Sequence, residues 1–156
     1  MMHEQALERI ALCKKQRLTY LDLSGLGLTE IPSEIATLIW LETLSLSENN
    51  ISDITPLAPL TELHKLSLSH NKISDLSPLG SNKKMKFLFI QDNQISDITP
   101  LRHLTTLKKL VAHTNHIQNV ESLTLLPHLV YLDVKQNPIQ DVNILDALGR
   151  LLVVKA

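Results

Sequence analysis

Leucines and isoleucines recur along most of this chain at fixed distances from one type of polar residue, an asparagine. The asparagines follow one another every 22 residues, at Asn49, Asn71, Asn93, Asn115 and Asn137. Around them the pattern is LxxLxLxxNxIxxI/LxPL, as in LETLSLSENNISDITPL, LHKLSLSHNKISDLSPL and MKFLFIQDNQISDITPL. A constant period of this length indicates a protein built from stacked structural repeats.

The array continues at both ends in altered form. An earlier copy, LTYLDLSGLGLTEIPSEI, has Leu26 where the asparagine belongs and runs 23 residues to the next register. A partial copy, LLVVKA, comes last. Residues 18–156 therefore hold about six repeats and a terminal partial strand.

Each copy combines two short elements. Leu44 and Leu46 alternate with polar residues, so the leucine pair points to one side of a strand and its neighbours to the other. The step Thr55-Pro56, which recurs in similar form in the next two copies, resembles a helix N-cap followed by proline at the first helical position. We therefore expect a strand, a turn and a short helical or 3₁₀ return in every copy.

One copy is too small to bury its own apolar side chains, so neighbouring copies must stack. Equivalent strands then lie about 4.8 Å apart in a parallel sheet, and equivalent leucines form continuous columns. A column of buried asparagines suits such a stack, because an amide can bond turn backbone groups that are hidden from water.

These repeats resemble the leucine-rich repeat family over about residues 18–156. Their 22-residue length and the ISDITPL element look most like the subclass found in internalin-like bacterial proteins and in the leucine-rich regulatory subunit of type-1 protein phosphatase. The first copy looks more like a bacterial 23-residue variant. The resemblance implies an α/β fold, namely a right-handed solenoid with a parallel β-sheet on its concave side and 3₁₀ or helical returns on its convex side. It also implies a scaffold that binds other proteins.

A helix is predicted for residues 3–16, because the apolar residues of this segment fall on one side. They are Ala6, Leu7, Ile10, Ala11 and Cys13. We interpret residues 1–17 as a capping helix over the first strand. Cys13 is then either a small apolar residue of the packed face or a reactive thiol.

The other end has no comparable cover. The segment LLVVKA would leave the edge of a strand open, and an open apolar edge invites pairing. Three explanations stay open: the chain is cut from a longer protein, the edge meets a partner or a second copy in a homodimer, or the last residues fray.

Composition narrows the class of protein. Of the residues, 44% are apolar and 20% charged, with 32 leucines but only five aromatic residues, so disorder is excluded as the main state. The formal charge of −1 is not that of a dedicated binder of nucleic acid or of an anionic membrane. A single cysteine excludes an internal disulfide framework and a cysteine-based zinc site. Early charged residues, and the lack of any run near ~18 apolar residues, predict a cytoplasmic protein.

Side-chain alternation identifies the residues that face outward from the sheet. The first outward row is Tyr20, Thr43, Lys65, Phe87, Lys109 and Tyr131. The second is Asp22, Ser45, Ser67, Phe89, Val111 and Asp133, and the third is Ser24, Ser47, Ser69, Gln91, His113 and Lys135. Both phenylalanines and both tyrosines of the chain stand in these rows, although the interior would be the more favourable place for them.

We predict that these aromatic residues form a partner-binding patch. Its apolar anchors would be Phe87, Phe89, Val111 and Tyr131, surrounded by Lys109, Asp133, His113, Lys65 and Gln91. Aromatic anchors inside a polar rim are typical of interface hot spots. The alternative is that cross-strand aromatic and β-branched neighbours merely stabilise the sheet.

A fourth row precedes the asparagines. In it Glu48, His70 and Asp92 would be neighbours that could respond to pH or bind a metal, or simply form cross-strand pairs at a solvated edge. Catalysis is not predicted, because Ser69 and His70 point differently and His113 has no nucleophile with an orienting acid beside it.

Two further features have ordinary structural interpretations. A local basic spot is usually a solvated face, and this one lacks the wider basic surface that nucleic acid requires. It consists of Lys83, Lys84, Lys86 and Lys108. Trp40, which we expect to be partly exposed, either packs over the irregular first junction or is a second contact point.

The sequence therefore predicts a non-catalytic protein-protein interaction module without cofactor or metal. It names no partner, pathway or organism. Two alternatives stay open: a structural module that assembles with itself through the C-terminal strand edge, and a sensor domain of a larger signalling protein.

Overall fold

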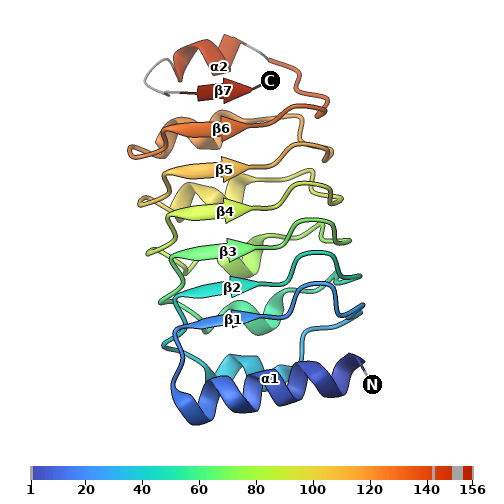
Figure 1. The fold of residues 1–156 in the computed structure, drawn as a ribbon. Helices are drawn as coiled ribbons and strands as arrows, with labels where there is room; N and C mark the ends of the chain where they lie inside the picture. The colour runs from blue at the N-terminus through green and yellow to red at the C-terminus, as the bar shows by residue number, and fades with distance from the viewer. Residues whose placement is uncertain (1, 142, 149–152, 156) are drawn as a thin grey trace.

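The computed structural model describes residues 2–141, 143–148 and 153–155. The chain begins with helix α1 (Met2–Gln16) and continues as a stack of short strands, one per repeat (Figure 1). The strands are β1 (Tyr20–Asp22), β2 (Thr43–Ser45), β3 (Lys65–Ser67), β4 (Phe87–Phe89), β5 (Lys109–Val111), β6 (Tyr131–Asp133) and β7 (Val153–Lys155). They form one open sheet of seven described strands in the order of the sequence, which confirms the predicted solenoid.

All neighbouring strands are parallel and pair without a shift in register. Leu44 of β2, for example, stands opposite Leu21 of β1 and Leu66 of β3. The same register continues through β6 and β7, where Leu132 stands opposite Val154. The outward rows expected from the sequence therefore exist as rows of neighbouring residues.

The returns on the far side of the sheet are short 3₁₀ helices, as predicted. They are η1 (Ser33–Thr37), η2 (Thr55–Leu57), η3 (Ser77–Leu79), η4 (Thr99–His103) and η5 (Glu121–Leu125). After β6 the return is instead an α-helix, α2 (Asn143–Ala147). Each of η2, η3 and η4 has proline in its first turn, because the ring fixes a φ that suits a helix start.

The expected N-cap role of Thr55 is wrong. Thr55 begins η2, the residue before it is Ile54, and no side chain caps the helix from that position. Instead, the carboxylate of Asp53 accepts a hydrogen bond from the backbone N–H of Thr55 at 2.8 Å. Hydrogen bonds from the hydroxyl and backbone of Thr55 lower the pKa of Asp53. Asp75 and Asp97, at the equivalent positions of the next two repeats, make the same backbone contact, each at 2.8 Å.

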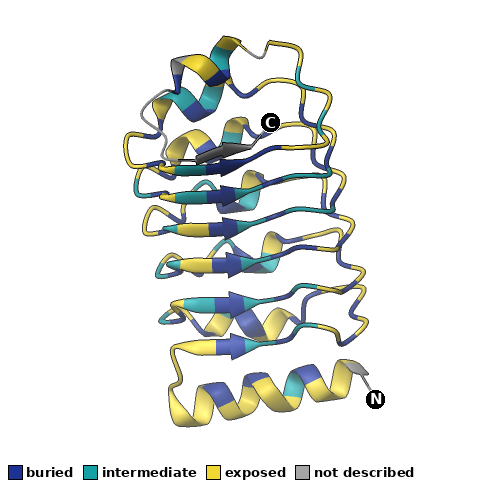
Figure 2. Cartoon of the chain, turned by 45° about the horizontal axis from the view of Figure 1, so that its top comes forward, coloured by how far each residue is buried: buried dark blue, intermediate teal, exposed yellow. Residues whose placement is uncertain are grey.

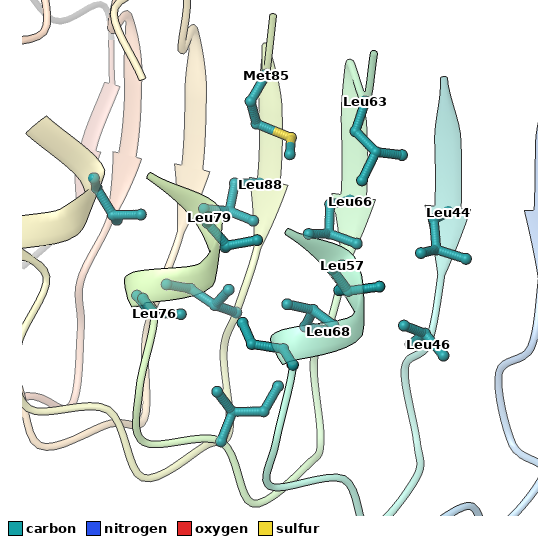
Figure 3. Packing of buried hydrophobic residues seen from close by; sticks show 14 of the residues in the cluster. Leu44, Leu46, Leu57, Leu63, Leu66, Leu68, Leu76, Leu79, Met85 and Leu88 are labelled. Carbon is teal, nitrogen blue, oxygen red and sulfur yellow. The ribbon is translucent and has the colours of Figure 1, made fainter. Parts of the chain in front are cut away.

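Leucines from strands and returns meet in the interior of the stack. In Figure 3, Leu57 of η2 and Leu79 of η3 reach toward strand leucines such as Leu66 and Leu88. All four of these side chains are fully buried. Figure 2 shows the same division along the stack, with the centre of the strands buried and their ends less so.

The asparagine column bonds hidden backbone groups, as predicted. The side-chain oxygen of Asn71 accepts the N–H of Ile51 at 3.0 Å, while its nitrogen donates to the carbonyls of Leu46, Leu68 and Ser69 at 2.9 to 3.2 Å. The other asparagines of the column make equivalent bonds, for instance from Asn93 to the repeat before it. Each amide therefore joins its own repeat to the preceding one.

Helix α1 covers the N-terminal end of the sheet. Ala6, Ile10 and Cys13 are buried against it, Leu7 is half-buried, and Ala11 is exposed, so the packed stripe is narrower than expected. Burial raises the pKa of the Cys13 thiol, whose Sγ lies 3.4 Å from the carbonyl oxygen of Leu18. Both observations favour a packed cysteine over a reactive one.

Trp40 lies over the first junction, in agreement with one of the two interpretations above. Its indole Nε1 donates to the carbonyl of Leu18 at 3.0 Å, and the guanidinium of Arg17 lies 4.8 Å from the centre of its ring. Through these two contacts, Trp40 packs against the segment that connects α1 to β1.

At the C-terminal end, β7 continues the sheet beside β6, as expected for part of LLVVKA. Beyond β7 the sheet has no further strand in the described part of the chain. The alternative that the last residues fray falls partly outside the described residues, which omit 151, 152 and 156, while residues 153–155 form β7. No described helix is long and apolar enough to cross a membrane.

Candidate protein-binding face

The surface of the sheet that points away from the core, here called the outer face, carries the three predicted rows. The central residue of each described strand from β1 to β6 is a buried leucine, while the residues before and after it point outward. This arrangement follows from the two-residue period of a strand. The outer face is therefore a fixed lattice of side chains with one strand per repeat.

The two phenylalanines lie on the outer face, not in the core. Phe87 is 38% exposed and Phe89 is half-buried, both on β4. In register on β5 are Lys109 beside Phe87 and Val111 beside Phe89. Tyr131 follows Lys109 on β6. The predicted anchors thus form one continuous area over three strands.

Lysine side chains lie over these rings. The Nζ of Lys65 is 5.7 Å from the centre of the Phe89 ring, and the Nζ of Lys109 is 5.6 Å from the same centre. Lys109 also lies 4.3 Å from the centre of the Tyr131 ring. These distances are within the range in which an ammonium is attracted to an aromatic face. Phe89 is therefore flanked by two cations.

Beside Phe89 the outer face is hollowed. A depression of about 330 Å³ is lined by Tyr20, Asp22, Thr43, Leu44, Ser45, Lys65, Ser67 and Phe89. Its floor is low because Thr43, Ser45 and Ser67 on β2 and β3 have small side chains, whereas Tyr20 on β1 and Phe89 on β4 are aromatic. The depression thus lies over the strands with small polar side chains, next to the aromatic patch.

Two predicted outward residues are in fact buried. Asp133 is 8% exposed, and the backbone N–H of Lys135 lies 3.4 Å from its carboxylate. It is therefore not part of an exposed rim. Ser69 is 6% exposed because its hydroxyl turns to the hydroxyl of Ser47, at 2.9 Å.

The remaining predicted rim residues surround the patch in different ways. Lys65 is exposed, and both Gln91 and His113 are half-buried. The Nδ1 of His113 is 3.0 Å from the hydroxyl of Thr114. The buried side-chain oxygen of Gln91 has no hydrogen-bond donor among the described residues.

The fourth row has a backbone property that the sequence analysis missed. Its residues adopt a left-handed conformation, with φ between 54° and 58°. They are Glu48, His70, Asp92, Thr114 and Gln136. The signal was present in the first copy, where Gly25, the residue before Leu26, has φ of 67°. Each left-handed residue turns the chain so that the following asparagine can point into the stack.

Two residues of this row, His70 and Asp92, lie beside each other on neighbouring repeats. His70 Nδ1 lies 3.6 Å from the carboxylate of Asp92, and both side chains are substantially exposed. Across the residues that the structure describes, no three histidine, cysteine or carboxylate side chains are placed to hold a metal ion. The geometry therefore favours the cross-strand interpretation.

The basic spot lies at the edge of the aromatic patch. Lys86 and Lys108 immediately precede β4 and β5, so they are next to Phe87 and Lys109 in the chain. Only Lys84 is engaged with an acid, since its Nζ is 2.6 Å from the carboxylate of Glu62. Other lysines of the spot have no ion-pair partner among the described residues.

Comparison with known proteins gives a consistent picture. The family model described as "Leucine Rich repeats (2 copies)" matches residues 16–59 and 61–103, and a second model, "Leucine Rich repeat", matches residues 126–142. No curated protein matches the chain.

Several solved structures are similar. Internalin C2 from Listeria monocytogenes is 38% identical with a TM-score of 0.79, and the match covers 87% of this chain and 59% of that one. Internalin InlF from the same species is 31% identical with a TM-score of 0.87, covering 94% and 43%. The ectodomain of the receptor kinase GASSHO1/SCHENGEN3 from Arabidopsis thaliana, solved in complex with CASPARIAN STRIP INTEGRITY FACTOR 2, is 29% identical with a TM-score of 0.71, covering 87% and 18%.

These matches confirm the predicted resemblance to internalin-like proteins, while the resemblance to the phosphatase subunit stays a prediction. The chain spans less than two thirds of the length of either internalin.

Proposed function

Because the chain belongs to the leucine-rich repeat family, we propose that it is a non-catalytic module that binds a protein partner on the outer face of its sheet. The apolar anchors are Phe87, Phe89, Val111 and Tyr131. The observation that carries this proposal is that both phenylalanines stand outside the core, whose described apolar residues include no phenylalanine. An aromatic patch in contact with solvent is a feature of interaction sites.

The mechanism is preorganisation. Every anchor stands on a strand whose central leucine is locked in the core, so the anchors keep their spacing before a partner arrives. Little conformational entropy is then lost on association, and more of the contact energy appears as affinity. One similar structure, the plant receptor ectodomain, was itself solved in complex with CASPARIAN STRIP INTEGRITY FACTOR 2.

The proposal is tested by affinity capture from extract of the source cells. Wild type is compared with the double variant Phe87→Ala/Phe89→Ala, and Leu125→Ala is the matched control because Leu125 is 61% exposed on η5, among the returns. We expect proteins that wild type and the control retain and the double variant loses. For an identified partner, Phe89→Ala alone should weaken binding by about 2 kcal/mol or more. Equal capture by all three proteins would refute the proposal.

A second candidate function, self-assembly, rests on the outer edge of β7. In the described part of the chain this edge pairs with no other strand, and such edges can template pairing with a further strand. Sedimentation velocity at several protein concentrations decides the point. A concentration-dependent dimer supports self-assembly, and a monomer throughout removes it.

The cytoplasmic location and the sensor-domain alternative stay predictions.

A further inference from the structure

Positive charge is concentrated around the two phenylalanines, although the chain as a whole carries a formal charge of −1. Lys65 and Lys109 stand on the outer face on either side of β4, and Lys86 and Lys108 precede β4 and β5 at the same end of the strands. Four lysines therefore surround Phe87 and Phe89, and we call them the lysine frame.

No described carboxylate forms an ion pair with any lysine of this frame. The carboxylates nearest in the lattice are engaged elsewhere or shielded: Asp92 with His70 at 3.6 Å, and Asp133 at 8% exposure. Asp22, at the far end of the depression, accepts hydrogen bonds from the hydroxyl and N–H of Ser24. Glu42 precedes β2 and is two strands away from Lys86, roughly 10 Å by strand spacing.

Two of these cations stand beside an apolar surface. The Nζ atoms of Lys65 and Lys109 lie 5.7 and 5.6 Å from the centre of the Phe89 ring. Charges arranged in this way favour a ligand of opposite sign and reject one of like sign.

Besides positive charge, the outer face offers a space for a side chain of a ligand, namely the depression next to Phe89. Its volume of about 330 Å³ is at the lower end of the usual range for ligand pockets, about 300–1,000 Å³. Tyr20 and Phe89 contribute aromatic walls, and Lys65 borders the same space. One apolar side chain of a partner can enter here while acidic residues beside it reach the lysines.

We propose that the segment recognised on the outer face is an acidic peptide stretch with an aromatic or large aliphatic residue at its centre. This inference rests on the proposed function and adds the chemistry of the partner. The central side chain occupies the depression beside Phe89, and the flanking carboxylates pair with Lys65 and Lys109.

A single-stranded nucleic acid would also offer negative charge and flat rings. Protein is favoured because the basic area is confined to a few lysines around Phe87 and Phe89. Phosphate binding depends on a broader row of cations. Nucleic acid is therefore kept as an outcome of the experiment.

The experiment uses two synthetic nonapeptide pools with a central Phe, Tyr, Trp or Leu. One pool has Asp and Glu in the flanks, the other Lys and Arg, and a ten-residue oligothymidine is added as a third ligand. Each is passed over the immobilised full chain, and retention is quantified by mass spectrometry or absorbance. We expect the acidic pool to be retained at least about tenfold more strongly than either of the others, with release at high salt.

Charge-reversal variants locate the interaction. Lys65→Glu/Lys109→Glu should lose the preference for the acidic pool, whereas Lys14→Glu/Lys15→Glu, which makes the same charge change on the exposed end of α1, should keep it. Circular dichroism melting of both variants verifies that they fold. Stronger retention of the basic pool or of oligothymidine, no retention of any pool, or equal losses in the two variants would overturn the inference.

The same variants separate this inference from the function it builds on. If capture from extract depends on the phenylalanine pair but not on Lys65 and Lys109, protein binding stands and the acidic partner is wrong. If capture depends on neither pair, the proposed function itself fails.

Discussion

The two faces of the same short strands follow opposite rules. On the inner face every strand from β1 to β6 presents a leucine at its centre, and these leucines stand in register. One residue away, the outer face changes at every step, from Tyr20 through Thr43 and Lys65 to Phe87. A stack requires each repeat to fit its neighbours, so the inner face must be uniform. No such demand acts on the outer face, which is where differences between repeats can serve recognition.

The largest effect is expected on the inner side, at the asparagine column. Asn71→Ala should lower the free energy of unfolding by about 4 kcal/mol, because it removes the bond to the N–H of Ile51 and three bonds to carbonyls in a buried position. Urea denaturation followed by circular dichroism measures the change. Asn50→Ala, at the exposed position directly after Asn49 of the same column, is the control and should change stability little. A loss below about 1 kcal/mol for Asn71→Ala would remove the column from the stabilising features.

Two adjacent residues of β4, one on each face of the sheet, test the difference between the inner and outer faces directly. Leu88 is fully buried, so Leu88→Ala should cost about 3 kcal/mol of stability, as for other core leucines. Phe89→Ala removes a larger side chain but should cost less than about 1 kcal/mol, since its ring lies on the outer face. Both variants are measured in the same urea titration. Comparable losses would mean that Phe89 acts mainly in packing, and the cross-strand alternative would then hold.

One buried position of the repeat does not carry the apolar residue that its neighbours have. Asn82 is fully buried in the segment between η3 and β4, at a place where the neighbouring repeats have Leu60 and Leu104. Its side-chain nitrogen donates to the carbonyl of Leu60 at 2.6 Å, but its oxygen has no donor among the described residues. Unlike the amides of the asparagine column, this amide is only half satisfied.

Asn82→Leu should therefore stabilise the protein, by about 1–2 kcal/mol, because it removes an unsatisfied buried oxygen and adds apolar burial. Asn82→Ala, which removes the amide without filling the space, is the matched comparison and should fall below the leucine variant. Thermal and urea denaturation give the order of the three proteins. If wild type is the most stable of them, the amide has a structural use that its one hydrogen bond does not reveal.

The repeat arithmetic allowed much of the fold to be predicted. A period of 22 residues together with the two-residue period of a strand is enough to place Phe87, Phe89 and Tyr131 on the outer face. The register of the outward rows was therefore predicted correctly, but Ser69 and Asp133 in these rows are buried. The failures concern local chemistry, since Asp53 and not Thr55 supplies the side-chain contact at the start of η2. The recurrent spacing of aspartate two residues before Thr or Ser was the overlooked signal.

The shape of the site could not be obtained in the same way. The depression beside Phe89, and the position of Lys65 and Lys109 over its ring, depend on side-chain rotamers that alternation does not fix. Burial of Asp133 depends on how its carboxylate turns toward Lys135. Sequence pattern thus identifies which residues share a face, while the contacts among them require the structure.

The smallest predicted effect concerns the turn that links the two faces. Thr114 has φ of 57°, a left-handed conformation that is unfavourable for a β-branched residue. Thr114→Gly should relieve this strain, by about 1–2 kcal/mol, and lose up to about 1 kcal/mol to greater freedom of the unfolded chain, for a net gain of about 0.5 kcal/mol. Thr105→Gly, at an exposed turn residue without positive φ, carries only the second effect and should destabilise. The difference between the two variants in parallel urea titrations isolates the strain. If both lose the same amount, the left-handed turn is not strained at Thr114, and its hydrogen bond to the side chain of Gln136 at 2.7 Å is what stabilises that conformation.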